Sequence, residues 1–203
     1  MLNLGPATQV VSLKTLRPAQ MTVGLRKVKE KRKEWAALPA KKRKAQMARQ
    51  LFPAVAGPKG RLYIIDHHHN ALALTHEGVE DVQVGLICDL SHLKAEEFWT
   101  FLDHRSWVHC YDAHGVRQGF DKIPKRFEDL TDDPYRSLAA SVEDAGGFSK
   151  PNEPFYEFLW ANHFRERIAL DLLDTSYDDA VAAACELARS KRSRHLPGWA
   201  GPK

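Results

Sequence analysis

Apolar and polar positions form two different patterns along the first ninety residues, one typical of strands and one typical of helices. Short apolar runs bounded by turn-forming residues predict four strands, at 8–13, 51–56, 61–65 and 82–89. Between them, helical spacing that is broken by proline or closed by glycine predicts three helices, at 23–37, 41–50 and 70–77. Strands that alternate with helices in this way predict a small α/β unit.

The second half of the chain has mostly helical spacing. Its apolar residues predict three helices, at 94–106, 154–168 and 177–190. Asp133-Pro134 and Gly146-Gly147 are typical of the start and the stop of a further helix. Residues 108–120 predict a hairpin with Asp112 to Gly115 at its tip.

These elements predict an α+β fold. We expect an α/β unit over residues 1–90 and a helical extension over residues 91–190 that packs on it within one compact domain. Residues 191–203 are basic and rich in glycine and proline, which predicts a flexible tail.

Composition narrows the class of protein. Hydrophobic residues make up 43% and charged residues 28% of the 203 positions, as in ordinary globular proteins. The cysteines Cys88, Cys110 and Cys185 form no paired motif, which indicates reduced thiols. No apolar run approaches the roughly 18 residues of a membrane span, and the N-terminus has no signal-peptide pattern. We therefore expect a cytoplasmic protein without a membrane partner.

Positive charge is concentrated in one part of the chain. The formal net charge is only +4, but residues 26–50 contain eleven Lys or Arg and two acids, Glu30 and Glu34. This stretch predicts either contact with phosphate groups, including those of a nucleic acid, or a solvated helix face. The sequence leaves the oligomeric state open.

The run Asp66-His67-His68-His69 stands where a predicted strand meets a predicted helix. The first turn of a helix has backbone N–H groups without helical partners, which favour an anion. Neutral imidazole binds transition metals, protonated imidazole binds phosphate, and carboxylates bind Mg²⁺. The run therefore predicts a site for a phosphate-like anion or a divalent metal, with Asp66, His67 and His69 as metal ligands.

A longer ordered pattern surrounds this run. It includes Leu16-Arg17-Pro18-Ala19-Gln20, Gly60-Arg61-Leu62-Tyr63-Ile64-Ile65-Asp66-His67-His68-His69 and Asp133-Pro134-Tyr135-Arg136-Ser137-Leu138. From residue 8 to about residue 168 the chain resembles the ParB-like nuclease family of the ParB/sulfiredoxin superfamily. The resemblance implies a phosphate or nucleotide site where an Asp-Gly-His-His-Arg motif opens a helix.

The resemblance also identifies departures from that motif. His67 stands in place of the glycine, and Asn70 stands in place of the arginine, which removes a bidentate phosphate contact. Gln20 stands where related kinases have a catalytic glutamate, and an amide cannot accept a proton as a carboxylate does. The resemblance implies that Lys31 is on a helix facing the motif, and Arg17 follows the first strand.

These observations predict a protein that binds a phosphate-bearing ligand, either a nucleotide or a nucleic acid, and that hydrolyses phosphodiesters with Mg²⁺ or a transition metal. The expected catalytic residues are Asp66, His68 and His69, since histidine titrates near neutral pH. The expected phosphate or nucleotide contacts are Arg17, Gln20, Lys31, His67 and Asn70. Two alternatives remain, a nucleotide-dependent small-molecule kinase and a non-catalytic regulatory module that binds nucleotides or DNA.

Overall fold

The computed structural model describes residues 7–202, which divide into two compact units. The first unit comprises residues 7–22 and 28–131, and the second comprises Val23–Lys27 and residues 132–202. The predicted α+β class is confirmed. The division expected after residue 90 lies instead between residues 131 and 132. The reason is that the helix beginning at Ala95 buries Phe98 and Leu102 in the core of the first unit.

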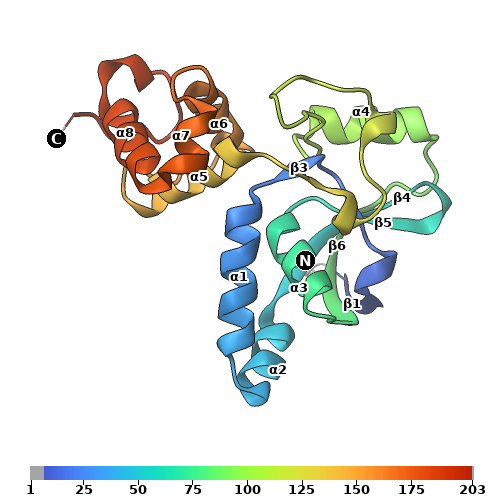
Figure 1. The fold of residues 1–203 in the computed structure, drawn as a ribbon. Coiled ribbons are helices and arrows are strands. Elements are labelled where there is room, and N and C mark those ends of the chain that lie inside the picture. The colour runs from blue at the N-terminus through green and yellow to red at the C-terminus, as the bar shows by residue number, and fades with distance from the viewer. Residues whose placement is uncertain (1–6, 203) are drawn as a thin grey trace, which may run out of the picture. The chain divides into compact units, whose positions relative to one another are not determined.

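A five-stranded mixed sheet forms the centre of the first unit, in the order β1-β6-β4-β5-β2 (Figure 1). Antiparallel pairing joins β1 (Ala7–Ser12) to β6 (Asp81–Asp89), and parallel pairing joins β6 to β4 (Leu51–Gly57). β5 (Arg61–Ile64) is antiparallel to β4 and parallel to the short β2 (Arg17–Pro18). The four strands predicted from apolar runs are therefore confirmed.

Four helices accompany this sheet, and each was predicted from its spacing. They are α1 (Leu25–Ala37), of which the first three residues belong to the second unit, α2 (Ala40–Arg49), α3 (His68–His76) and α4 (Ala95–His104). Pro39 separates α1 from α2 because it is extended, with φ −60° and ψ 151°. Gly78 follows α3 in the left-handed conformation, as its position at the helix end predicts.

The sheet buries side chains on both faces. Val55 and Tyr63 are opposite each other on β4 and β5 and belong to the same core as Phe98 and Leu102 of α4. Gly57 lies so close to this layer that an added Cβ would stand 2.8 Å from atoms of Phe98 and Tyr63. The preceding and following residues Ala54 and Ile64, which pair with each other, are also fully buried, so side chains on the other face are buried too.

Helices form most of the second unit. They are α5 (Pro134–Asp144), α6 (Tyr156–Arg165), α7 (Leu170–Thr175) and α8 (Tyr177–Arg189). Asp133 caps α5 by accepting hydrogen bonds from the backbone N–H groups of Tyr135 and Arg136. The core of this unit includes a stacked pair, Phe148 and Trp160, with ring centroids 4.2 Å apart. The sequence did not predict α7, which is only six residues long.

The segment after residue 190 is packed within the second unit, so the flexible tail expected there is wrong over residues 191–202. The indole N–H of Trp160 donates to the Pro197 carbonyl at 2.9 Å, and that of Trp199 donates to the Ser190 carbonyl at 3.1 Å. Ser193 is fully buried. These contacts fix the segment despite its glycine and proline content.

The structure also bears on the predicted hairpin and on the cysteines, and it contains a second, small sheet that the sequence did not predict. The predicted hairpin over residues 108–120 is reduced to a single antiparallel bridge between Tyr111 and Arg117. The short strands β3 (Thr22–Val23) and β7 (Thr131–Asp132) form a separate two-stranded sheet. All three cysteines are free thiols. Within residues 7–202, no helix has both the length and the apolar character needed to span a membrane.

Candidate functional site

The Asp66–His69 segment forms a sharp turn from β5 into α3. Between Ile64, the last residue of β5, and His68, the first of α3, His67 adopts the left-handed conformation with φ 66° and ψ 24°. Its backbone N–H donates to Asp66 Oδ1 at 2.6 Å. Glycine adopts this conformation most easily, which explains physically why the motif that the chain resembles has glycine at this place. His67 preserves the shape of the turn despite its side chain.

His68 lies in the core rather than at the surface, with only 3% of its area exposed. Its Nε2 accepts a hydrogen bond from the Ala19 backbone N–H at 3.0 Å, and the ring forms a second hydrogen bond with the backbone of Ile64. Burial lowers the pKa of His68 from 6.5 to about 3. The expectation of a pKa near neutrality is therefore wrong for His68. Through these two hydrogen bonds, the neutral ring connects α3 to Ala19, which follows β2, and to Ile64, the last residue of β5.

Asp66, His67 and His69 do not converge. Asp66 and His67 are exposed and His69 is half-buried. The His67 ring stands edge-on to buried Phe52, with ring centroids 6.1 Å apart. Across residues 7–202, no three His, Cys, Asp or Glu side chains gather as a group that could hold a metal ion. The described residues therefore offer no ready-made three-ligand group at the turn, and metal binding by Asp66, His67 and His69 stays a prediction.

Arg17 and Gln20 follow the edge of the sheet beside this turn. Arg17 is half-buried on β2, in register with Tyr63 of β5. Gln20 is 5% exposed, and its Nε2 donates to the Thr22 carbonyl at 2.7 Å. Because Ala19 is bonded to His68, this segment is held next to the start of α3. The hydrogen bond from Gln20 stabilises the backbone at the start of β3. Ligand contacts by Arg17 and Gln20 stay predictions.

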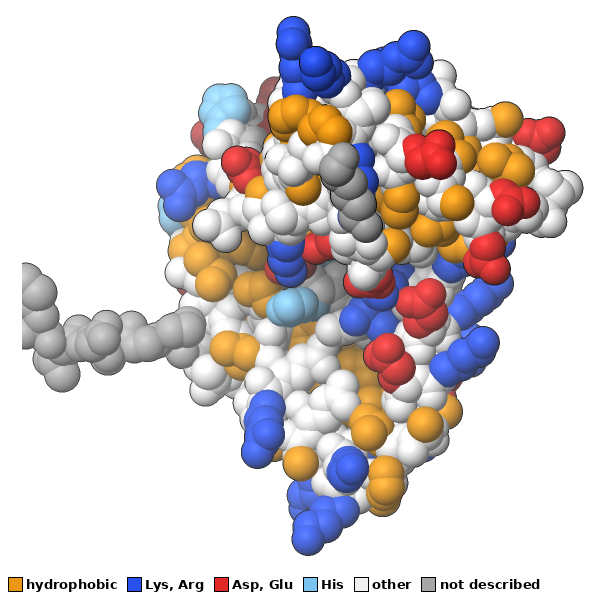
Figure 2. Space-filling view, turned by 90° about the vertical axis from the view of Figure 1, so that its left-hand side faces the viewer, with side chains coloured by type: hydrophobic (Ala, Val, Ile, Leu, Met, Phe, Trp, Pro, Cys, Tyr) orange, Lys and Arg blue, Asp and Glu red, His pale blue; other side chains and the backbone are white. Residues whose placement is uncertain are grey.

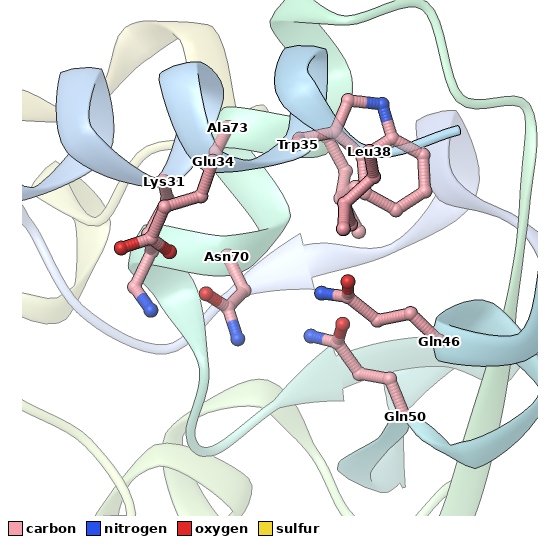
Figure 3. Close-up of a pocket in the computed structure, with 9 residues that line it drawn as sticks. Lys31, Glu34, Trp35, Leu38, Gln46, Gln50, Asn70 and Ala73 are labelled. Carbon is pink, nitrogen blue, oxygen red and sulfur yellow. The ribbon is translucent and has the colours of Figure 1, made fainter. Parts of the chain in front are cut away.

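Lys31 and Asn70 come from distant parts of the sequence and line the same pocket, which has a volume of about 300 Å³. Figure 3 shows the Lys31 and Glu34 side chains of α1 next to Asn70, the third residue of α3. The helix that carries Lys31 thus lies beside the helix that begins at the motif. The role of Lys31 and Asn70 in binding stays a prediction.

Three helices contribute one face each to this pocket. The lining residues are spaced by three or four along each helix or just past its end, namely Lys31, Glu34 and Trp35 of α1 with Leu38 after it, Gln46 of α2 with Gln50 after it, and Asn70, Ala73 and Leu74 of α3. Sequence reasoning missed Glu34, Gln46 and Gln50 as site residues. The four-residue spacing of the two glutamines was the available signal, but a basic helix gave no reason to single them out.

One group in the pocket is unsatisfied. Gln50 Nε2 is buried and has no hydrogen-bond partner within residues 7–202. A buried donor left without an acceptor costs on the order of 1–3 kcal/mol. Such groups are uncommon in folded proteins, and an acceptor on a water molecule or on a bound ligand satisfies them.

The predicted basic stretch forms parts of α1 and α2. Five residues of α2 are basic and none is acidic, namely Lys41, Lys42, Arg43, Lys44 and Arg49. Figure 2 shows Lys and Arg side chains standing out at the lower end of the view, the end at which Figure 1 places α2. Arg43 differs from the other basic residues of α2, because its guanidinium packs back on the chain and donates to the carbonyls of Trp35 and Ala36 at the end of α1.

Comparisons with known proteins identify the family of the chain. The family model described as "Putative ParB-like nuclease" matches residues 9–166. The crystal structure of protein Atu1540 from Agrobacterium tumefaciens is similar along almost the whole chain, with 46% sequence identity and a TM-score of 0.90. The match covers 98% of this chain and 100% of that one. A search of the curated proteins finds no match.

Proposed function

Because the chain belongs to the ParB-like nuclease family, we propose that it binds a ligand carrying phosphate groups at the first turn of α3. The observation that carries this proposal is the meeting of Lys31 with Asn70 in one pocket that reaches the first turn of that helix. The helix dipole and the backbone N–H groups of a first turn favour negative charge. The α1 ammonium group adds a cation on the same side.

Binding of inorganic triphosphate and of nucleoside triphosphates, measured by isothermal titration calorimetry, tests the proposal. The variants are Lys31→Met, which retains the aliphatic stem of the side chain, and Asn70→Ala. We expect Lys31→Met to weaken binding about tenfold or more, since hydrogen bonds to charged groups contribute about 1.5–3 kcal/mol. Lys125→Ala, an exposed lysine elsewhere in the first unit, is the matched control. Unchanged affinity in Lys31→Met, or no binding by the unaltered protein, would overturn the proposal.

Phosphodiester hydrolysis is the finer part of the proposal. His68 is neutral and its Nε2 is occupied by the Ala19 N–H, so we assign proton transfer to His69 instead, with Asp66 as the exposed carboxylate of the turn. The chain by itself offers no three-residue metal group within residues 7–202, and the proposal includes no step through a metal. Cleavage of a synthetic phosphodiester with Mg²⁺, with Mn²⁺ and with a chelator tests the activity, and His69→Ala and Asp66→Asn should abolish it. Turnover that persists in both variants would sink this assignment.

Glu34 favours a second candidate, the nucleotide-dependent small-molecule kinase. The sequence lacks a glutamate at the usual place, where Gln20 stands, and a kinase therefore needs a carboxylate from elsewhere. Glu34 lies beside Lys31 and Asn70 in the pocket (Figure 3). A kinase would consume ATP or ADP only with a hydroxylated acceptor, and Glu34→Gln would stop transfer while nucleotide still binds. Ligand binding without hydrolysis or transfer would leave the regulatory module as the function.

A further inference from the structure

Three carboxamides meet in the pocket beside α3. Gln46 and Gln50 are four residues apart at α2 and therefore share a face, and Asn70 belongs to the first turn of α3. Figure 3 shows the amide groups of both glutamines extending from α2 toward Asn70. Gln46 is exposed and Gln50, the residue that caps α2, is half-buried, so neither side chain belongs to the apolar core of the unit.

The rest of the pocket is divided into an apolar and a charged part. The Trp35 indole, 7% exposed, and Leu38 stand together at one side, while Lys31 and Glu34 stand by Asn70 (Figure 3). Arg43 lies over the indole with its guanidinium carbon 5.7 Å from the ring centroid and helps to fix it. A ligand in this space meets an apolar surface and several amide donors and acceptors at once.

Gln50 supplies the observation that points to a missing partner. Its Nε2 is buried and finds no acceptor in the part of the chain that the structure describes. The pocket in which its amide lies has room for one small ring system, at about 300 Å³, and is too small for a polymer. An acceptor on a bound ligand would satisfy this donor.

We propose that Gln46 and Gln50 recognise a nucleobase, so that the phosphate-bearing ligand is a mononucleotide whose base lies between α1 and α2. Carboxamides suit this task because each offers a donor and an acceptor in one plane, which matches the hydrogen-bonding edge of a base. Trp35 and Leu38 provide apolar contact for the ring. Asn70 belongs both to the pocket and to the first turn of α3, and thus links the base to the phosphate groups. This inference rests on the proposed function.

Calorimetry with three kinds of probe separates the two proposals. The probes are the four ribonucleoside triphosphates, inorganic triphosphate and the four unphosphorylated nucleosides, each titrated into the full chain. We expect at least one nucleoside triphosphate to bind ten times more tightly than inorganic triphosphate. Gln50→Leu and Gln46→Leu should each weaken that nucleotide about tenfold and change the affinity for inorganic triphosphate less than twofold. Gln9→Leu, on exposed β1, is the matched control.

Stability provides a readout that a merely structural role would not give. Leucine removes the unpaired donor, so Gln50→Leu should unfold at the same temperature as the unaltered protein or a higher one, while it loses nucleotide affinity. Inorganic triphosphate that binds as tightly as every nucleotide, or a Gln50→Leu protein with full nucleotide affinity, would overturn the inference alone. Nucleosides that bind through Gln50 without any phosphate effect would instead overturn the phosphate proposal. The absence of all binding would overturn both.

Discussion

Of the three helices that line the candidate pocket, α2 and α3 differ most in what stabilises them. In α3, five of nine residues are buried, including His68 and Leu72, and the helix belongs to the core. In α2, none of ten residues is buried, and five carry positive charge. A helix that is polar all round depends on contacts at its ends or on a partner. The position of α3 in the pocket wall is thus set by its packing in the core. The residues of α2 are not constrained by the core and can vary with the ligand.

The difference also shows in how each helix is joined to its surroundings. α3 is held by His68, which bonds to Ala19 across forty-nine positions of the sequence. α2 is held by Arg43, which bonds to the last carbonyls of α1 only seven and eight residues away. Loss of the hydrogen bond between His68 and Ala19 should therefore destabilise the whole first unit. Loss of the Arg43 hydrogen bonds should destabilise only the region where α1 meets α2.

His68→Ala should have the largest effect. It leaves the Ala19 N–H buried without an acceptor and a cavity where the ring was, so we expect a loss of about 3 kcal/mol in the free energy of unfolding. Urea denaturation followed by circular dichroism measures it. His76→Ala, at the exposed end of the same helix, is the control and should change stability by less than about 0.5 kcal/mol. A His68→Ala protein as stable as this control would show that α3 is not held as we describe.

A fall in pH should have the next largest effect on the free energy of unfolding, because two buried histidines resist protonation in the folded protein. Burial lowers the pKa of His68 to about 3 and that of His163, in the second unit, to about 4. Below pH 6.5 these two histidines take up protons in the unfolded chain but not in the folded one, so stability falls as the pH falls. Each contributes at most about 1.4 kcal/mol per pH unit. Urea midpoints between pH 6.5 and 5, above the range of ordinary carboxylates, test this, and His68→Asn should reduce the slope. A flat profile would contradict it.

Arg43→Ala should have a smaller effect that is confined to the corner between α1 and α2. The variant loses two hydrogen bonds to the end of α1 and the contact over the Trp35 ring, which together contribute about 1 kcal/mol. Hydrogen exchange should report faster opening of α2 while β4 and α3 remain protected. Lys44→Ala removes a neighbouring exposed charge and serves as the control. Equal protection of α2 in both variants would mean that Arg43 does not hold the helix.

The exposed lysines of α2 should have the smallest effect on stability. Replacing Lys41, Lys42 and Lys44 together by alanine should change the free energy of unfolding by less than about 0.5 kcal/mol per residue. If this face contacts nucleic acid, the slope of log affinity against log salt should become less steep by up to about 0.9 per lost phosphate contact. Fluorescence anisotropy with a labelled DNA duplex measures the slope. An unchanged slope would leave these lysines as a solvated surface.

The sequence predicted those elements whose periodicity is long or whose boundaries are marked chemically. The basic helices were delimited by Pro39, and the start of α5 was marked by Asp133 before Pro134. The short α7 and the packing of residues 191–202 depend on distant contacts, such as that of Trp160 with Pro197. Periodicity along the chain contains no information about such contacts.

The candidate site was predictable in position and less so in detail. The motif indicated the right turn, but three consecutive histidines gave no sign of which one is buried. That depends on the left-handed backbone of His67, which sets the phase of α3 and turns His68 toward Ala19. Gln46 and Gln50 could not be recognised as pocket residues from the sequence, because they line the pocket only once α2 lies beside α3 in the fold.

Trp35 gives the pocket an optical signal of its own. The indole forms part of the pocket wall and is almost fully buried, whereas the other four tryptophans lie outside the pocket lining. A ligand that enters beside the ring changes the polarity around one chromophore among five. The wavelength and intensity of its emission should therefore follow occupancy without a dye or a tag, and Trp35→Phe should remove that change while the background emission remains.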